Sequence, residues 1–191
     1  MSFFKLFKRR KRELGTEKRA VTLPDWLKKG VYIEYTVTNS HKKNAEPSPL
    51  SFEVLEVLDR KGRVKVKICR PTMGFSDSYT IDPETLLADR PVVPMWINSE
   101  ELKEGDKVLM MKPKKKKDGY GTIIGSEEID TKKYGLRECW RIEIVVERDK
   151  GIYWYDKLTG ILISNVRVLV RGTENKSNKI CCIVKDTNIL E

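Results

Sequence analysis

Residues 139 to 170 read CWRIEIVVERDKGIYWYDKLTGILISNVRVLV, and this stretch decides the fold that we expect for the whole chain. From 140 to 147, apolar and charged side chains alternate, as they do on an extended strand with one buried and one solvated face. Residues 148–151 and 156–160 have the composition of turns, with an aromatic strand between them and a valine-rich strand after the second. The stretch therefore predicts a three-stranded antiparallel meander.

The alternation extends toward the N-terminus. Residues 31–38 form one alternating segment, and residues 52–68 form a hairpin around an Asp-Arg-Lys-Gly turn. The first strand of that hairpin loses its alternation at Leu55-Glu56, which predicts a β-bulge and a curved sheet. Its second strand carries Arg63, Lys65, Lys67 and Arg70, which we interpret as a solvated stripe rather than a phosphate-binding face. Further extended segments are expected at 108–111 and 120–129.

Short connectors separate these strands. Helical turns are expected at 23–30, 82–87 and 99–105, because each has a capping residue or proline near its start and two of them end at a glycine. Residues 92–97 are apolar but are interrupted by Pro94, so they predict an edge segment or a plug over an open barrel end.

The expected fold class is therefore mainly β: a single strongly curved antiparallel sheet, as in a half-barrel or open barrel, with a few short helical turns. Residues 1–22 are expected to form a basic, disordered tail, and residues 23–191 the β domain. The glycine pairs Gly30/Gly119 and Gly62/Gly151 have equal separations, which suggests two similar units at about 30–111 and 119–191.

Composition narrows the class of protein. A chain of 191 residues can bury one ordinary core, and it contains no apolar run near the roughly 20 residues that a spanning helix needs. The many lysines and glutamates, with no glutamine and one histidine, resemble the composition of thermophile proteins. We expect a cytoplasmic protein without a signal peptide, because the basic run follows the short N-terminal apolar segment instead of preceding a longer one.

The net charge of +10 lies in two places. Residues 1–19 carry eight basic and two acidic side chains, a net +6, and residues 112–118 carry five basic and one acidic, a net +4. The remainder of the chain is therefore neutral. A basic excess confined to a tail and a loop favours weak contact with a polyanion over a sequence-specific nucleic-acid surface.

The four cysteines have neither the spacing nor the histidine partners of a zinc site, so no metal and no cofactor are expected. Cys69 and Cys139 are interpreted as small buried apolar residues, with a disulfide between them as the alternative. The single histidine, His41, lies in a polar loop without a nucleophile motif. These patterns predict that the protein is not an enzyme.

Three segments near the C-terminus resemble the closing strands of LolA-like lipoprotein-carrier half-barrels and related microbial β proteins. They are GSEEI (125–129), YGLRECW (134–140) and YWYDKLTGIL (153–162). In that family the concave face of the sheet holds acyl chains, so the resemblance implies a half-barrel with an apolar concavity. It covers about the last third of the chain.

The first functional hypothesis is a non-catalytic half-barrel that binds an apolar ligand or a protein partner in its curve. The residues expected to line the concavity are Tyr35, Trp140, Ile142, Ile144 and Trp154, with core packing as the alternative role for each.

The second part of the hypothesis is contact with an anionic membrane surface, which would make the protein peripheral to the membrane. The alternative is non-specific nucleic-acid binding by the same basic segments, and a solvated tail without a partner is a third reading. The residues expected to contact the membrane or polyanion are Phe3, Phe4, Phe7, Lys8, Arg9, Arg10, Lys11, Arg12, Lys114, Lys115, Lys116 and Lys117.

Overall fold

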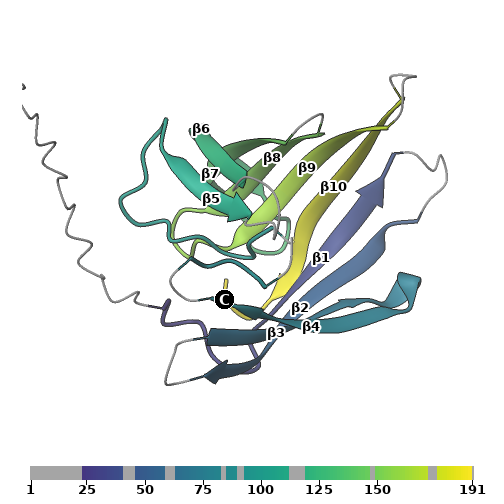
Figure 1. Cartoon of the computed structure of the whole chain (residues 1–191), viewed down its shortest axis with the longest axis vertical. Coiled ribbons are helices and arrows are strands. Elements are labelled where there is room, and N and C mark those ends of the chain that lie inside the picture. The colour runs from purple at the N-terminus through teal and green to yellow at the C-terminus, as the bar shows by residue number, and fades with distance from the viewer. Residues whose placement is uncertain are drawn as a thin grey trace, which may run out of the picture.

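The computed structural model describes residues 23–40, 46–58, 63–82, 85–89, 93–111, 119–146, 149–171 and 176–190. Ten strands form one antiparallel sheet (Figure 1). The strands are β1 Tyr32–Asn39, β2 Ser48–Leu58, β3 Arg63–Arg70, β4 Phe75–Ile81, β5 Lys107–Met111, β6 Gly119–Asp130, β7 Leu136–Val146, β8 Asp149–Asp156, β9 Leu162–Arg171 and β10 Lys176–Thr187. The expected fold class, a single curved antiparallel sheet, is confirmed.

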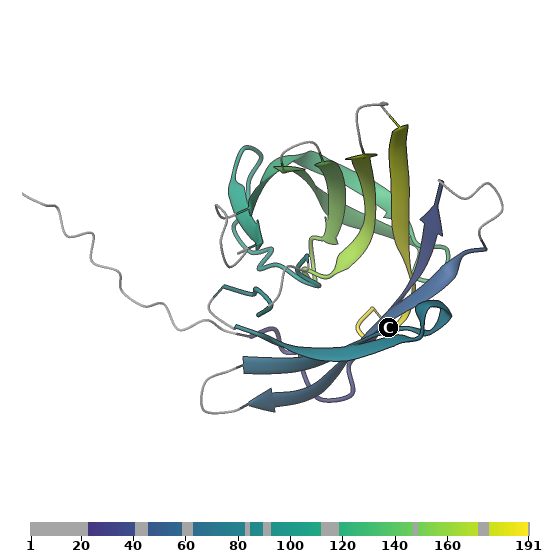
Figure 2. The same ribbon diagram turned by 45° about the vertical axis from the view of Figure 1, so that its right-hand side comes forward.

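The sheet order is β4-β3-β2-β1-β10-β9-β8-β7-β6-β5. It consists of two meanders, β1 to β4 and β5 to β10, that join where the first strand pairs with the last. Figure 2 shows β6 to β10 curling around a common interior while β1 to β4 continue from β10 as a flatter layer. Strand β5 pairs with β6, so residues 107–111 belong to the second meander and not to a unit that begins near residue 30. The sheet is curved but not closed.

Bulges accompany this curvature. The register of β2 against β3 shifts between Val54 and Glu56, which confirms the bulge that the broken alternation predicts. Shifts also occur between Ile123 and Ser126 in β6 and near Tyr155 in β8. An extra residue on one strand bends that strand and increases its twist, which helps a sheet to curl.

Only one helix occurs in the described ranges, the 3-10 turn Pro71–Met73 between β3 and β4. The helical turns expected at 23–30, 82–87 and 99–105 are wrong; the described residues there form non-helical turns. The reason is local, because Leu86 at φ 56° and Glu101 at φ 62° adopt left-handed conformations that do not continue a right-handed helix. Asp82 nevertheless caps the turn as its sequence position predicts, because its Oδ1 accepts a hydrogen bond from the Thr85 N–H at 3.1 Å.

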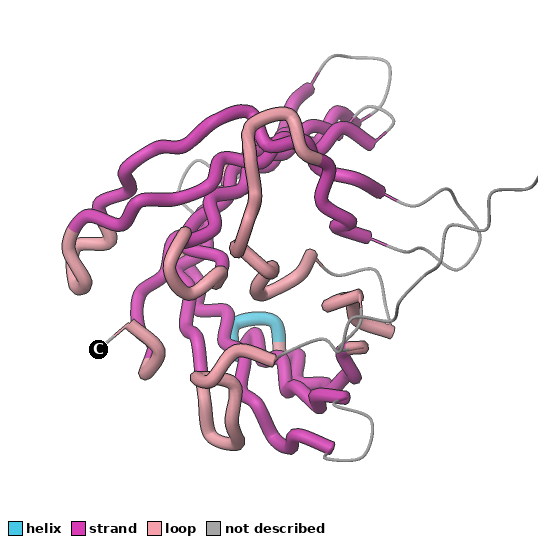
Figure 3. Tube along the Cα trace, turned by 90° about the vertical axis from the view of Figure 1, so that its left-hand side faces the viewer, coloured by secondary structure: helices cyan, strands magenta, loops and turns pink. Residues whose placement is uncertain are grey.

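The apolar segment after residue 92 is a plug, as one of the two sequence interpretations has it. In Figure 3 several loop segments, drawn in pink, lie on the inner side of the curved sheet. Trp96 bridges to Ile161, and the Ile97 N–H donates to the Gly160 carbonyl at 2.9 Å. Trp96 also packs edge-on against Trp26, with ring centroids 5.7 Å apart. This segment fills one end of the curl with aromatic and aliphatic side chains.

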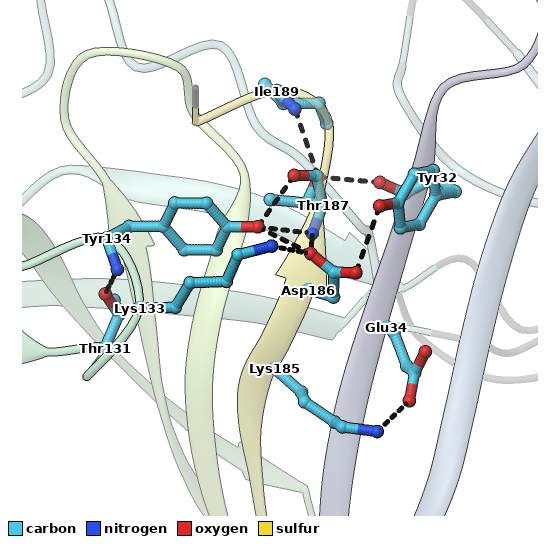
Figure 4. A network of polar contacts seen from close by, with 9 residues as sticks. All are labelled: Tyr32, Glu34, Thr131, Lys133, Tyr134, Lys185, Asp186, Thr187 and Ile189. Atoms are coloured by element: carbon cyan, nitrogen blue, oxygen red, sulfur yellow. Dashed lines mark hydrogen bonds and ion pairs between the residues drawn. The ribbon is translucent and has the colours of Figure 1, made fainter.

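A polar network ties the turn between β6 and β7 to the ends of β10 and β1 (Figure 4). The Asp186 carboxylate accepts hydrogen bonds from the Tyr134 hydroxyl at 2.8 Å, the Tyr32 hydroxyl at 3.1 Å and the Lys133 ammonium group. The Tyr134 hydroxyl also accepts the Thr187 N–H at 2.8 Å. Because β7, β8 and β9 lie between β6 and β10 in the sheet, these bonds hold the curl together across those strands.

All four cysteines are free, so the alternative of a Cys69–Cys139 disulfide is wrong. Strands β2, β1, β10, β9 and β8 lie between β3 and β7, which carry the two thiols. Cys139 is fully buried, as expected of a small apolar residue, whereas Cys69 is only half-buried. Among the residues that the structure describes, no helix has the length and apolar character needed to span a bilayer.

Candidate functional site: a cavity on the concave face

A cavity of about 1000 Å³ lies against the concave face where the two meanders meet. Strands β1, β2, β3, β8, β9 and β10 all contribute side chains to it, and the 3-10 turn closes one side. Its volume is at the upper end of the range for small-molecule sites. The flattening of the sheet beyond β10 therefore leaves a space that the plug does not fill.

Strand alternation explains which residues face the cavity. On β1 the lining residues are Tyr35, Val37 and Asn39, every second position, and on β10 they are Ile180 and Cys182. The same spacing of two recurs on β2 and β3, as expected for one face of a pleated sheet.

The floor of the cavity is aromatic and aliphatic. The ring of Tyr35 stands edge-on to that of Phe52, with centroids 5.9 Å apart, and its hydroxyl donates to the Leu162 carbonyl at 2.7 Å. Burial raises the pKa of Tyr35 well above its ordinary value, so this hydroxyl stays neutral. Tyr153 and Leu50 extend the apolar surface. The floor therefore offers contacts for an apolar chain without a buried charge.

Charged side chains stand on the lining as well. Arg70 at the end of β3 and Arg167 on β9 are both half-buried, and Glu46, which precedes β2, is exposed. Arg70 donates a weak hydrogen bond to the Met73 sulfur at 3.9 Å. Within the described ranges, neither guanidinium has a carboxylate at ion-pair distance. The described part of the lining thus combines an apolar floor with two cations and one anion.

Asn165 and Cys182 are paired on β9 and β10, between the two arginines. Asn165 is 92% buried, and its Oδ1 has no hydrogen-bond partner among the described residues. Burial raises the pKa of the Cys182 thiol, although the charges of Arg70 and Arg167 and a hydrogen bond from Asn165 act in the opposite direction. The thiol is therefore protonated at neutral pH, and both arginines lie near enough for their charges to act on it.

Of the five residues predicted to line the concavity, the structure places only Tyr35 at this cavity. Ile142 and Ile144 are on β7 and are 0% and 4% exposed in the packed core. The ring of Trp140 lies under the Lys157 ammonium group, which is 4.2 Å from its centroid. Trp154 pairs with Arg141, on the face opposite Tyr153, and its Nε1 donates to Glu127 at 2.9 Å.

The expectation that these five side chains share one concavity is therefore corrected. The curl is tight around β6 to β8, where its interior is filled by core residues and the plug. The open space lies on the other side of β9 and involves the first meander, which was not expected to contribute more than Tyr35.

The predicted membrane or polyanion contacts, residues 3, 4, 7–12 and 114–117, lie outside the described residues and stay predictions. In the described part of the chain, no three His, Cys, Asp or Glu side chains gather as a metal site would need. Cys139 is a poor nucleophile, because burial raises the pKa of its thiol to about 12.

Comparison with known proteins adds little about function. No family model matches the chain, and no curated protein matches it. A crystal structure from Bacteroides fragilis, of a protein with a YmcC-like fold whose description proposes that it is exported, aligns with a TM-score of 0.45 and 10% sequence identity. The alignment covers 84% of this chain and 96% of that one. No family model of LolA-like carriers matches the chain, and the part of that resemblance that agrees with the structure is a β-rich fold.

Proposed function

We propose that this protein is a non-catalytic binding protein that holds an apolar ligand in the cavity between its two meanders. The observation that carries the proposal is a space of about 1000 Å³ whose floor is formed by Tyr35, Phe52 and Leu162. The cavity is partly open to solvent, and an apolar occupant would remove the apolar part of its lining from water.

Two further points support the proposal. The hydroxyl of Tyr35 is already bonded to the backbone, so the floor does not need a polar ligand to satisfy it. The resemblance to LolA-like carriers implies the same use of a concave sheet face, since that family holds acyl chains there. A protein segment with an apolar side chain is the alternative occupant.

We include in the proposal a cytoplasmic location and contact of the N-terminal basic segment with anionic membranes, which would bring the cavity close to a source of acyl chains. Non-specific nucleic-acid binding is the alternative use of the same charges. No observation on the described residues favours it.

A cavity-filling variant tests the binding function. Val37→Trp places an indole in the cavity, whereas Thr38→Trp places the same group on the exposed, opposite face of β1. We expect the delipidated wild-type protein to enhance the fluorescence of N-phenyl-naphthylamine, a neutral apolar dye. Val37→Trp should weaken dye binding about tenfold or more, and Thr38→Trp should not.

Circular dichroism spectra should show that both variants keep the β-sheet fold. Equal dye binding by the wild type and Val37→Trp would place the dye elsewhere and overturn the proposal. Absence of dye binding by the wild type, together with recovery of a protein partner through a crosslink at position 37, would instead favour the protein segment.

A further inference from the structure

Arg70 and Arg167 approach the same cavity from opposite sides of the junction between the meanders. β2, β1 and β10 lie between their strands, so only the curvature of the sheet and the length of the side chains let both reach one space. Cys182 on β10 lies between them, and the charges of both guanidinium groups act on it. Both arginines therefore line one cavity whose floor is apolar.

This arrangement lacks a counter-charge. A half-buried guanidinium group loses part of its hydration, and in most proteins a carboxylate compensates for that loss. Neither arginine has such a partner among the described residues; the Met73 sulfur, 3.9 Å from Arg70, is a weak acceptor. Among the described residues, Glu46 is the one acidic residue that lines the cavity, and it is exposed. The cavity therefore keeps a net positive charge where it borders the apolar floor.

We propose that the occupant of the cavity is a single-chain amphiphile with an anionic oxygen head group, which Arg70 and Arg167 bind while the chain lies against Tyr35, Phe52 and Leu162. This inference rests on the proposed function and specifies its ligand. Planar guanidinium groups bind carboxylate or phosphate oxygens with paired, charge-assisted hydrogen bonds. A carboxylate and a phosphate monoester share this chemistry.

Asn165 also lines the cavity, and its Oδ1 is buried without a donor among the described residues. An amide oxygen accepts hydrogen bonds, so it does not contribute to anion binding, and the head-group assignment rests on the two arginines.

Decanoate, decyl phosphate and decanol have alkyl chains of the same length and differ in their head groups. Comparing their affinities therefore measures what the head group contributes to binding. Isothermal titration calorimetry of the delipidated full-length protein should show that at least one of the two anions binds about tenfold or more tightly than decanol. Arg70→Gln and Arg167→Gln should each remove most of that preference, because each should weaken anion binding much more than decanol binding. Acetate and inorganic phosphate, which lack the chain, should bind weakly or not at all.

Arg63→Gln is the matched control. Arg63 lies on the same strand as Arg70 but is exposed on the opposite face, so the same loss of charge should not change the preference. Glu46→Gln should strengthen anion binding, because it removes a negative charge from the lining. Circular dichroism would check that each variant keeps its sheet.

The outcomes separate this inference from the proposed function. Equal affinity of the wild type for the anions and decanol would overturn the head-group assignment while the apolar cavity stands. The same preference in Arg70→Gln, Arg167→Gln and Arg63→Gln would also overturn it. Failure of all three ligands to bind would overturn the proposed function itself. Tighter binding of decanoate than of decyl phosphate would identify the carboxylate as the preferred head group, and the reverse would identify the phosphate.

Discussion

At the scale of single residues, the Tyr134 hydroxyl is a central atom of the polar network. It lies 2.8 Å from Asp186 and 2.7 Å from the Thr187 carbonyl. Hydrogen bonds from Lys133 and Tyr134 lower the pKa of Asp186 to about 2. A carboxylate with a lowered pKa stabilises the fold above its unfolded pKa, and this contribution is lost as the pH falls toward 2.

Tyr134→Phe should therefore raise the pKa of Asp186 toward the ordinary aspartate value of about 3.9 and lower the stability at neutral pH. The pKa can be followed by NMR titration of the Asp186 carboxyl carbon, and the free energy of unfolding by urea denaturation. The stability difference should shrink as Asp186 becomes protonated in both proteins. Tyr120→Phe is the control, because Tyr120 is half-exposed on β6. An Asp186 pKa unchanged in Tyr134→Phe would contradict the role of this hydroxyl.

At the scale of elements, the plug packs against Gly160 in the turn between β8 and β9. Gly160 has a φ of +74°, and a Cβ atom built on it would lie 2.2 Å from the Ile97 carbonyl oxygen. Gly135 has a similar φ of +70° with nothing within 4 Å of such a Cβ. Alanine substitutions at these two glycines therefore distinguish the cost of backbone strain, which both share, from the cost of contact with the plug, which occurs only at Gly160.

Gly135→Ala should cost about 1 to 2 kcal/mol of stability, because an L-residue is disfavoured in the left-handed conformation. Gly160→Ala should cost about 3 kcal/mol or more, since the plug must also move and lose the hydrogen bond from Ile97 to Gly160. Urea denaturation measures both, and the emission of Trp96 should change only in Gly160→Ala. Equal costs for the two variants would mean that the plug does not press on this turn.

Much of the sheet could be predicted from the sequence, because period-two alternation is a direct property of half-buried strands. The meander β7 to β9, the hairpin β2 to β3 and its bulge follow this pattern. Strand β10 was not identified, although it joins the meanders. Its segment Ile180 to Val184 is almost continuously apolar, with neighbours on both sides, so it lacks the alternation of a strand with one wet face.

The candidate site was harder to predict, since the sequence does not show which face of the sheet is enclosed. Arg70 was grouped with Arg63, Lys65 and Lys67 as a solvated stripe. Arg70, however, comes two residues after the buried Ile68, so both side chains lie on the same face of β3, and the structure places Arg70 at the cavity. Counting the alternation through to the end of β3 would have identified it. The cavity itself depends on where the sheet stops curling, which is a property of long-range packing.

At the scale of the whole molecule, the junction of the first and last strands links the two halves of the sheet. Strand β1 pairs with β10 on one side and with β2 on the other, so the cavity takes side chains from residues as far apart in sequence as Tyr35 and Cys182. A ligand in this cavity would contact both meanders and should stabilise their relative arrangement. Because such a ligand would contact both meanders, it should raise the free energy of unfolding of the whole sheet and not of one meander alone.

The distribution of charge over the whole chain leads to a last prediction. Residues 8–12 are all basic, and a lysine or arginine near an anionic membrane surface contributes about 1 kcal/mol to binding. We expect the protein to sediment with liposomes rich in phosphatidylserine and not with neutral ones, and this binding to weaken at high salt. Replacing residues 8–12 with glutamine should abolish sedimentation, whereas replacing residues 114–117 with glutamine should reduce it only partly.

Both variants should keep the decanoate affinity of the wild type, because the decanoate contacts that we propose are made by Arg70, Arg167 and the cavity floor. Parallel titrations with single-stranded RNA distinguish the two uses of the charge. If RNA binds more tightly than the liposomes and both variants lose RNA affinity equally, the basic segments act as a general polyanion surface and the membrane role is wrong. If phosphatidylserine liposomes bind more tightly than RNA and replacing residues 8–12 abolishes sedimentation, the N-terminal basic segment is a membrane-binding segment.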